Sequence, residues 1–204
     1  MSIRVWGLTG LIGSGKSLAL EMLKRKGCPA IDADEVSRWV VDPSRDEGTE
    51  GLSRVRLAFG EEVFLADGSI DRAKLRLVIA GDNVQRNRLE QILHPLILGR
   101  VEKEIRGWEA QGFSLGVIEG TRLIEAGYLS RLAGLIVVTS DAARRLERVR
   151  ARDGMADRDI EALGALQDGE LMLAKARLVW INDAEPSVLE AQVDAFLATE
   201  IPHF

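Results

Sequence analysis

Residues 7–23 read GLTGLIGSGKSLALEML, and this stretch decides the fold. Inside it, residues 10–17 match the phosphate-loop pattern G-x-x-x-x-G-K-[ST] in full. The preceding residues 3–9 are apolar and β-rich, which predicts a buried strand. Residues 16–26 carry apolar side chains at helical spacing and stop before Gly27, which predicts a helix. Strand, glycine-rich loop and helix in this order are the context that the pattern requires.

The loop contains the groups that hold a nucleoside triphosphate. Its glycines let backbone N–H groups curl around the β-phosphate, and the helix that follows presents its positive N-terminus. Lys16 is expected to act in catalysis by reaching the β- and γ-phosphates, and Ser17 to bind Mg²⁺ through its hydroxyl. We therefore predict ATP and Mg²⁺ as cofactors, Ser17 as the metal ligand, and these nucleotide-binding residues: Gly10, Gly13, Ser14, Gly15, Lys16, Ser17 and Leu18.

Length, composition and charge narrow the class of protein. The 204 residues suffice for one domain with insertions, and 46% hydrophobic with 29% charged residues is ordinary for a globular chain. No apolar run reaches the roughly 18 residues that span a bilayer. The net charge of −5 argues against a nucleic-acid partner. The first residues lack signal-peptide features, so we expect a cytoplasmic protein that acts on a small molecule, with no nucleic-acid or membrane partner.

Four further segments read as strands. They are short, apolar and bounded by turn residues, as is typical of buried parallel strands, and they lie at 29–31, 113–120, 134–140 and 177–183. Helical patterns separate them, so the chain is predicted to form an α/β fold with a parallel five-stranded sheet between helical layers. In the helical region before 113–120, Asp71 is predicted to cap a helix, and Pro95 to divide or kink a longer one.

Two carboxylates follow the second predicted strand. Asp32 and Asp34 stand where ligands of open α/β sheets bind, at the carboxyl end of a strand. A carboxylate there could take a proton from an acceptor hydroxyl while Mg²⁺ and Lys16 neutralise the phosphoryl group. Both residues also have a structural interpretation, because Asp32 could cap the next helix and Asp34 could complement its dipole.

Six arginines fall between residues 144 and 158. Arg144, Arg148 and Arg152 are spaced by four, which places them along one face of a helix, and a planar guanidinium forks well onto phosphate. The segment resembles a lid that closes over the triphosphate, and we predict a catalytic role for two of the six, Arg148 and Arg152. The alternative is a solvated face whose arginines pair with acidic residues such as Asp153.

His94 directly precedes Pro95 in the stretch LEQILHP. The proline is expected to push His94 out of regular helix, which could aim its ring at a cleft. The alternative is a structural histidine in an apolar helical stretch.

With these residues assembled, the chain resembles the dephospho-coenzyme A kinase family. The segments that carry the resemblance stand in the family's order and cover most of residues 3–155: GLTGLIGSGKS, AIDADEVSRWVV, FGEEVFLADGSIDRAKLR, RLEQILHPLI, IEAG and RRLERVRARDG. The resemblance implies a phosphate-loop NTPase fold, with one kinase domain over 1–204, a helical acceptor-binding insertion at about 60–110 and an arginine-bearing lid at about 144–165.

The resemblance also implies a reaction. The γ-phosphate of ATP moves to the ribose 3′-hydroxyl of dephospho-coenzyme A, and Asp34 occupies the position of the base. Asp32, Arg38, His94 and Arg122 are the residues that we expect to bind the acceptor.

The chain departs from the family pattern in places. Leu11 and Leu18 replace glycine and threonine, and residues 119–125 read EGTRLIE where D-x-P-L-L-x-E is expected. Near the end, RLVWIND replaces A-D-x-V-I-D-N, so base contacts are not carried over to Asn182 or Asp183. Two alternatives follow: a kinase for another hydroxyl acceptor, or a nucleotide-binding homologue with little catalysis. Lys16, Ser17 and Asp34 favour an enzyme, because binding alone needs no base.

Arg122 replaces an apolar residue of the family pattern. If it is buried there, an unpaired guanidinium costs several kcal/mol. We therefore expect it either to pair with Glu119 or Glu125 or to bind a phosphate group of the acceptor.

Overall fold

The computed structural model describes residues 2–165 and 167–201. The chain forms two compact units: Met1–Asp32 together with Gly107–Phe204, and Ala33–Arg106. The second unit is therefore an insertion between the two halves of the first. This unit begins earlier than the helical insertion expected at about 60–110, at Ala33, and it ends at Arg106.

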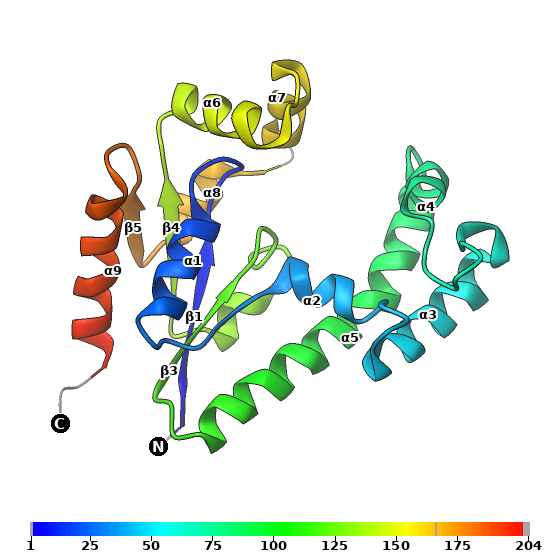
Figure 1. Ribbon diagram of the computed structural model, residues 1–204, viewed down its shortest axis with the longest axis horizontal. Helices are drawn as coiled ribbons and strands as arrows, with labels where there is room; N and C mark the ends of the chain where they lie inside the picture. The colour runs from blue at the N-terminus through cyan, green and yellow to red at the C-terminus, as the bar shows by residue number, and fades with distance from the viewer. Residues whose placement is uncertain (1, 166, 202–204) are drawn as a thin grey trace. The chain divides into compact units, whose positions relative to one another are not determined.

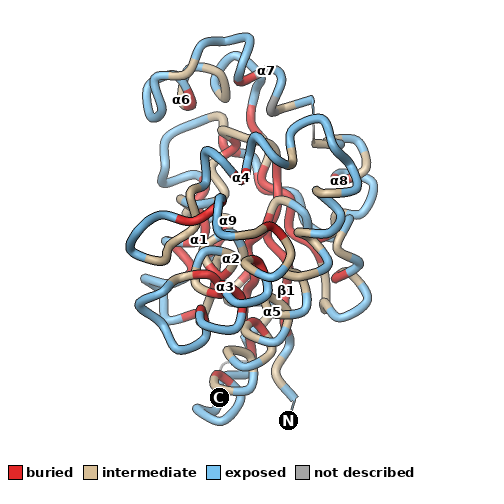
Figure 2. Tube along the Cα trace, turned by 90° about the vertical axis from the view of Figure 1, so that its right-hand side faces the viewer, coloured by how far each residue is buried: buried red, intermediate tan, exposed pale blue. Residues whose placement is uncertain are grey.

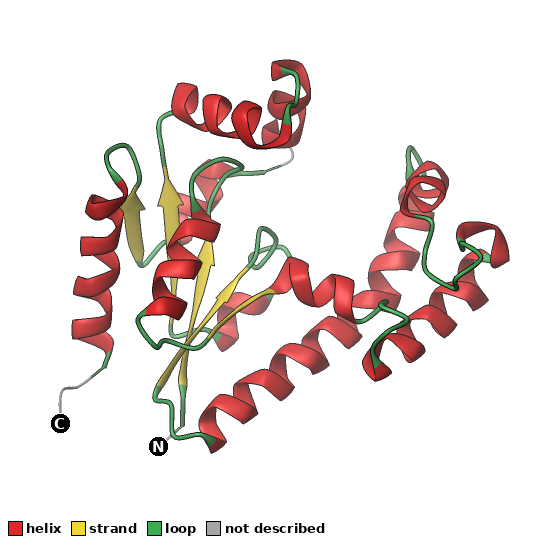
Figure 3. Ribbon diagram, in the orientation of Figure 1, coloured by secondary structure: helices red, strands yellow, loops and turns green. Residues whose placement is uncertain are grey.

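The first unit is built on a five-stranded sheet whose strands are all parallel, in the order β2-β3-β1-β4-β5 (Figures 1 and 3). The strands are β1 (Arg4–Thr9), β2 (Ala30–Asp32), β3 (Leu115–Glu119), β4 (Gly134–Thr139) and β5 (Leu178–Ile181). Four fall inside segments that the sequence predicts as strands, and β2 overlaps the predicted segment 29–31 but ends one residue later, so the predicted fold class is confirmed. Because the strands are parallel, their carboxyl ends meet at one edge of the sheet.

The helices of the first unit are α1 (Lys16–Arg25), α6 (Ala142–Asp153), α7 (Asp157–Ala165), α8 (Gly169–Lys175) and α9 (Pro186–Glu200), with a short 3-10 turn at Tyr128–Arg131. α1, α8 and α9 pack against strands of the sheet, whereas α6 and α7 pack against each other. α1 packs against α9, and both contribute to a core with the strands that includes Leu8, Leu23, Ile136 and Leu189. α8 packs against β4. Figure 2 shows buried residues concentrated along the central strands. No helix of the described residues is both long and apolar enough to cross a membrane.

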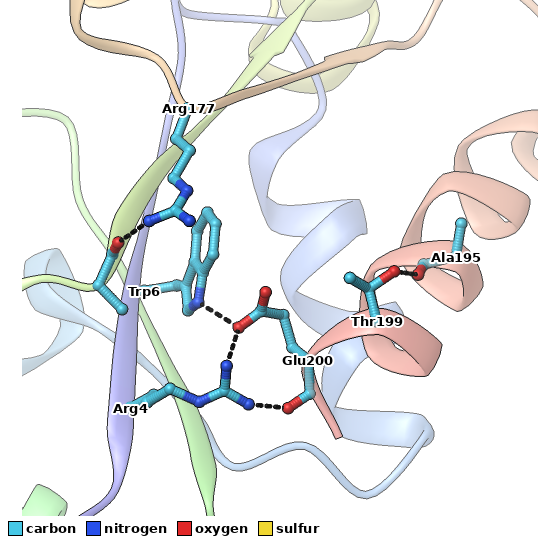
Figure 4. A network of polar contacts seen from close by, with 7 residues as sticks. Arg4, Trp6, Arg177, Ala195, Thr199 and Glu200 are labelled. Atoms are coloured by element: carbon cyan, nitrogen blue, oxygen red, sulfur yellow. Dashed lines mark hydrogen bonds and ion pairs between the residues drawn. The ribbon is translucent and has the colours of Figure 1, made fainter. Parts of the chain in front are cut away.

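Aromatic side chains lock α9 onto the sheet. Phe196 meets the rings of Trp6 and Trp180 edge to face, with ring centroids 5.1 and 5.7 Å apart. About one turn further along, at the end of the helix, Glu200 accepts hydrogen bonds from the Trp6 indole and from Arg4, as Figure 4 shows. The amino-terminal half of β1 and the end of α9 are thereby held together.

The second unit is helical. It contains α2 (Ala33–Trp39), α3 (Asp46–Phe59), a 3-10 turn at Glu61–Val63, α4 (Arg72–Ile79) and most of α5 (Asn83–Ala110). The predicted cap at Asp71 is confirmed, because its carboxylate accepts from the backbone N–H groups of Ala73 and Lys74 at 3.1 and 3.0 Å. Each hydrogen bond satisfies a donor that the first turn of α4 leaves unpaired.

Pro95 does not divide the long helix. α5 runs from Asn83 through Ala110 with Pro95 inside it. Of the two expected alternatives, two abutting helices are therefore wrong and a single helix is confirmed. His94 keeps helical geometry, and the expectation that it leaves regular helix is also wrong. A proline removes a single N–H donor, and packing of the remaining turns offsets that loss.

Candidate active site

The phosphate loop joins β1 to α1 at the carboxyl edge of the sheet. Gly10, Gly13 and Gly15 have φ angles of +150°, +77° and +101°, which side chains with a Cβ rarely adopt. At Gly13 a Cβ would also lie 2.5 Å from the carbonyl oxygen of Arg145. The glycines of the pattern are thus needed both for the shape of the loop and for its close approach to α6.

The N-terminus of α1 has no protein cap. Gly15 is the N-cap residue and makes no side-chain cap hydrogen bond, and the first turn holds no acidic residue. The first intrahelical bond is donated by Ala19 to Gly15. The earlier N–H groups, those of Lys16, Ser17 and Leu18, therefore lack an intrahelical acceptor. This end of the helix is suited to an anionic ligand such as phosphate.

The carbonyl oxygen of Leu11 closes the loop on itself. It accepts from the Lys16 ammonium at 3.3 Å and from the Ser14 N–H at 3.1 Å. Ser14 is completely buried, and its role in nucleotide binding stays a prediction. Ser17 is exposed beside Lys16 at the start of α1.

Three residues distant in sequence hold the loop from outside. The Asn182 side-chain amide donates to the Ser14 carbonyl at 2.9 Å, and the Gln167 side-chain oxygen accepts from the Ile12 N–H at 2.8 Å. Arg148 donates a longer bond of 3.4 Å to the Gly13 carbonyl. Sequence reasoning missed the first two. Asn182 drew attention only as a departure from the family pattern, and Gln167 carries no local signal.

Arg148 belongs to the arginine segment, and its side chain hydrogen-bonds this loop. Besides Gly13, its guanidinium donates to the Ser140 hydroxyl at 3.1 Å and to the Asn182 carbonyl at 2.8 Å. Its planar fork thus joins α6 to the ends of β4 and β5. The Asp183 carboxylate completes the cluster by accepting from the Ser140 hydroxyl at 2.8 Å and from the Asp141 N–H at 2.7 Å. These bonds, chiefly the one from Asp141, lower the pKa of Asp183.

Other arginines of this segment pair with neighbouring acids. Arg150 binds Asp157 with a bidentate fork, and Arg152 binds Asp153 with contacts of 2.7 and 2.6 Å. The Arg152 side chain is 63% exposed. For Arg152 the geometry therefore matches the solvated-face alternative, and its catalytic role stays a prediction.

The remaining predicted residues fall in both units. Asp32 ends β2 and is half-buried, and Arg122 follows β3 and is exposed. The free-energy cost of burying an unpaired guanidinium therefore does not arise at Arg122, and the premise of burial is wrong. Asp34 and Arg38 lie exposed on α2 in the second unit. The structure brings together the loop, Lys16, Ser17 and Arg148, all within the first unit.

His94 also belongs to the second unit, where it is half-buried. Its Nε2 atom is fully buried, and within the described part of the chain it has no hydrogen-bond partner.

A cavity of about 570 Å³ lies beside the phosphate loop within the first unit. Its lining includes Leu11 and Ser14 from the loop, Thr139 at the end of β4, and Met172 from α8. The loop is therefore accessible along the side that faces β4 and α8.

A phosphate loop in front of an uncapped helix, at the carboxyl edge of a five-stranded parallel sheet, defines a phosphate-loop kinase fold. The family model for dephospho-CoA kinase matches residues 4–188. The dephospho-CoA kinase of Geobacter sulfurreducens is 36% identical over 98% of this chain and 100% of its own, and that of Methylococcus capsulatus is 36% identical over 94% and 93%. The chain belongs to the dephospho-CoA kinase family, whose members are phosphotransferases with an alcohol group as acceptor.

Solved structures share this fold. TT1252 of Thermus thermophilus aligns with a TM-score of 0.84 at 26% identity, and the alignment covers 99% of this chain and 100% of that protein. The dephospho-CoA kinase of Campylobacter jejuni aligns with a TM-score of 0.63 over 96% of both chains. At 19% identity this second likeness concerns the fold alone.

Proposed function

We propose that the chain uses ATP to phosphorylate dephospho-CoA, and that the product is CoA. The observation that carries the proposal is the N-terminus of α1, where Lys16 stands in a first turn without acidic residues and the Gly15 N-cap makes no side-chain cap hydrogen bond, in a chain that belongs to the family along nearly its whole length. An anion-binding end of this kind suits the phosphates of a nucleotide donor. The finer proposal is transfer to the ribose 3′-hydroxyl. A cytoplasmic location also stays a prediction.

In the reaction that we propose, the acceptor hydroxyl oxygen forms a bond to the γ-phosphorus of ATP. The bond from that phosphorus to the bridging oxygen of ADP breaks, and ADP leaves. Asp34 takes the proton of the hydroxyl, while Lys16 and the N–H groups of the loop balance the charge of the phosphates. Asp34 is exposed on α2, so it is accessible to an acceptor.

Four residues are proposed to bind the acceptor, two in each unit. Arg38 and His94 are offered by the helical unit, and Asp32 and Arg122 by the ends of β2 and β3. The buried Nε2 of His94, which has no hydrogen-bond partner among residues 2–165 and 167–201, supports a role toward a ligand. The segment from about 144 to 165 is proposed to act as the lid.

Mg²⁺ is also proposed, with the Ser17 hydroxyl as its protein ligand. The described residues contain no group of three or more His, Cys, Asp or Glu side chains that could hold a metal ion. An exposed hydroxyl fits Mg²⁺, which takes oxygen ligands and is usually bound by few protein groups together with substrate phosphates. When bound, the ion supplies charge neutralisation at the phosphates.

The proposal is tested by measuring ADP release from ATP with a panel of alcohol acceptors that includes dephospho-CoA. The product is identified by mass, and the position of the new phosphate by ³¹P NMR. We expect dephospho-CoA to give the highest kcat/KM and a 3′-phosphate. A higher kcat/KM with another acceptor would reject the substrate, and a phosphate on another hydroxyl would reject only the 3′ assignment.

A further inference from the structure

We propose that Asn182 is a positioning residue of the transfer reaction. Its side-chain amide fixes the peptide between Ser14 and Gly15, and thereby sets the direction of the Gly15 N–H in the phosphate loop. Asn182 stands directly after β5, 168 residues away from Ser14 along the chain. The sequence pattern that identifies the loop does not include it.

The first evidence is a buried hydrogen bond. The Asn182 Nδ2 donates to the Ser14 carbonyl oxygen at 2.9 Å, where Asn182 is 4% and Ser14 0% exposed. This carbonyl and the Gly15 N–H belong to the same peptide. Because a trans peptide is planar, its C=O and N–H groups point in opposite directions. Holding the carbonyl against Asn182 therefore turns the Gly15 N–H away from Asn182.

The second evidence is the close packing at Gly15. A Cβ on Gly15 would lie 2.1 Å from the Asn182 Nδ2, and the φ angle of Gly15 is +101°. Glycine has access to many backbone conformations, so its position in the loop must be held by its surroundings. Asn182 does this twice, through its hydrogen bond to Ser14 and through direct contact with Gly15.

The third evidence is the support behind Asn182. Its own carbonyl accepts from the Ser140 hydroxyl at 3.0 Å and from Arg148 at 2.8 Å. Ser140 is held in turn by Asp183. Backbone and side chain of Asn182 are thus both fixed, which is what a residue must provide if it orients a catalytic group. Arg148 acts in the same way, because its guanidinium binds protein carbonyl groups.

A positioning role predicts effects on nucleotide binding and on rate. Preorganised N–H donors stabilise the charge of a transferring phosphoryl group. A misplacement of about 1 Å can lower a rate by roughly 10²-fold. Since the Asn182 amide is one of several supports of the loop, we expect its removal to lower kcat/KM for ATP by roughly 10- to 100-fold.

The experiment compares Asn182→Ala with the matched control Gln192→Ala. Gln192 also uses its amide to hold backbone groups of β5, with bonds of 2.9 and 2.8 Å to the Ile181 N–H and C=O, and no described bond joins it to the phosphate loop. ADP affinity is measured by calorimetry without acceptor. The change in the Gly15 amide chemical shift on ADP addition is followed by ¹H–¹⁵N NMR. We expect weaker ADP binding and a smaller Gly15 shift in Asn182→Ala, while Gln192→Ala stays within about twofold of the parent.

The inference rests on the proposed use of ATP, but both ADP measurements are independent of the acceptor, so an error in the acceptor would leave them unchanged. A folded Asn182→Ala protein with parental ADP affinity and Gly15 shift would overturn the inference. So would a loss of stability alone, with parental affinity in the folded fraction. If Asn182→Ala does not fold, Ser140→Ala removes one bond to the Asn182 carbonyl. Ser140→Ala should then change the ADP affinity and the Gly15 amide shift by a smaller amount than is expected for Asn182→Ala. Parental values of both in Ser140→Ala would overturn the inference.

Discussion

Helices α1 and α6 both begin at the carboxyl edge of the sheet, after the neighbouring strands β1 and β4, but their N-termini are built differently. At α6 the Asp141 carboxylate accepts from the N–H of Ala143, and the Asp183 carboxylate accepts from the N–H of Asp141. At α1 the N-cap is a glycine, and the first turn holds no acid. One end is closed by protein carboxylates, whereas the other has none.

The difference separates a structural helix end from a binding one. A carboxylate at a helix N-terminus satisfies unpaired N–H groups and complements the helix dipole. The same carboxylate at α1 would occupy the donors that a phosphate needs and would repel it. A glycine N-cap in place of Ser, Thr, Asn or Asp costs stability in the unliganded protein, about a few tenths of a kcal/mol. That cost is consistent with selection for binding an anion.

The largest effect is expected when the proposed base is removed. This base, Asp34, takes the proton of the acceptor hydroxyl and belongs to α2 rather than α1. Asp34→Asn keeps the shape of the side chain but removes its ability to take a proton, so kcat should fall by roughly 10²- to 10⁴-fold. ADP affinity should stay parental, because it depends on the open end of α1. Turnover and calorimetry on the same preparation check both points. A folded variant with parental kcat would leave Asp34 as a residue that only complements the dipole of α2.

The next effect concerns the cation at the open helix end. Lys16→Ala removes the ammonium that lies over the loop through its bond to Leu11. The loss of such a charge contact in the transition state is expected to lower kcat by roughly 10²- to 10³-fold. The variant should keep the circular dichroism of the parent, since the side chain is only half-buried. A kcat within a few-fold of the parent value would show that Lys16 of the loop does not act in phosphoryl transfer.

The fold was predictable because its signals are local. Each strand is a short apolar run between turn residues, and the helix after Asp71 follows a capping signal. The phosphate loop was recognised for the same reason, since its glycines, lysine and serine lie within eight residues. Local patterns of this kind survive in any tertiary context that buries the strands.

The external supports of the loop could not be predicted in this way. Asn182 and Gln167 reach loop residues that lie 168 and 155 positions away in sequence. An amide side chain has no periodicity that points to a distant partner. For His94 a local signal gave a wrong prediction. A residue before proline usually avoids helical geometry, but His94 lies inside the continuous helix α5. At Arg122, the expected cost of an unpaired guanidinium holds only for a buried side chain, and this side chain is exposed.

A smaller effect should separate two arginines of α6. Arg148→Lys keeps the charge, but one ammonium cannot span Gly13, Ser140 and Asn182 as the guanidinium does. We expect kcat/KM for ATP to fall by about tenfold. Arg152→Lys should change it by less than about threefold, because Arg152 is exposed and bound to Asp153. Equal losses in both variants would indicate general electrostatic attraction of the nucleotide, and a larger loss at Arg152 would restore its predicted catalytic role.

The smallest effect is expected at the closed end of α6, and it concerns stability. Asp183→Asn keeps a side-chain oxygen that can accept from the Asp141 N–H, but it removes the charge. Hydrogen bonds from Asp141 and Ser140 lower the pKa of Asp183 in the folded protein. Its contribution is therefore fully present above the unfolded-state pKa of about 3.9, and it is lost as the pH falls through the lower folded pKa. Urea midpoints of parent and variant should consequently differ at pH 7 and converge below about pH 4.

The other carboxylates titrate in both proteins, so their effects on the urea midpoint largely cancel when parent and Asp183→Asn are compared. A difference that stays constant with pH would show that the charge of Asp183 does not stabilise this helix end, and the contrast with α1 would then rest on hydrogen bonds alone.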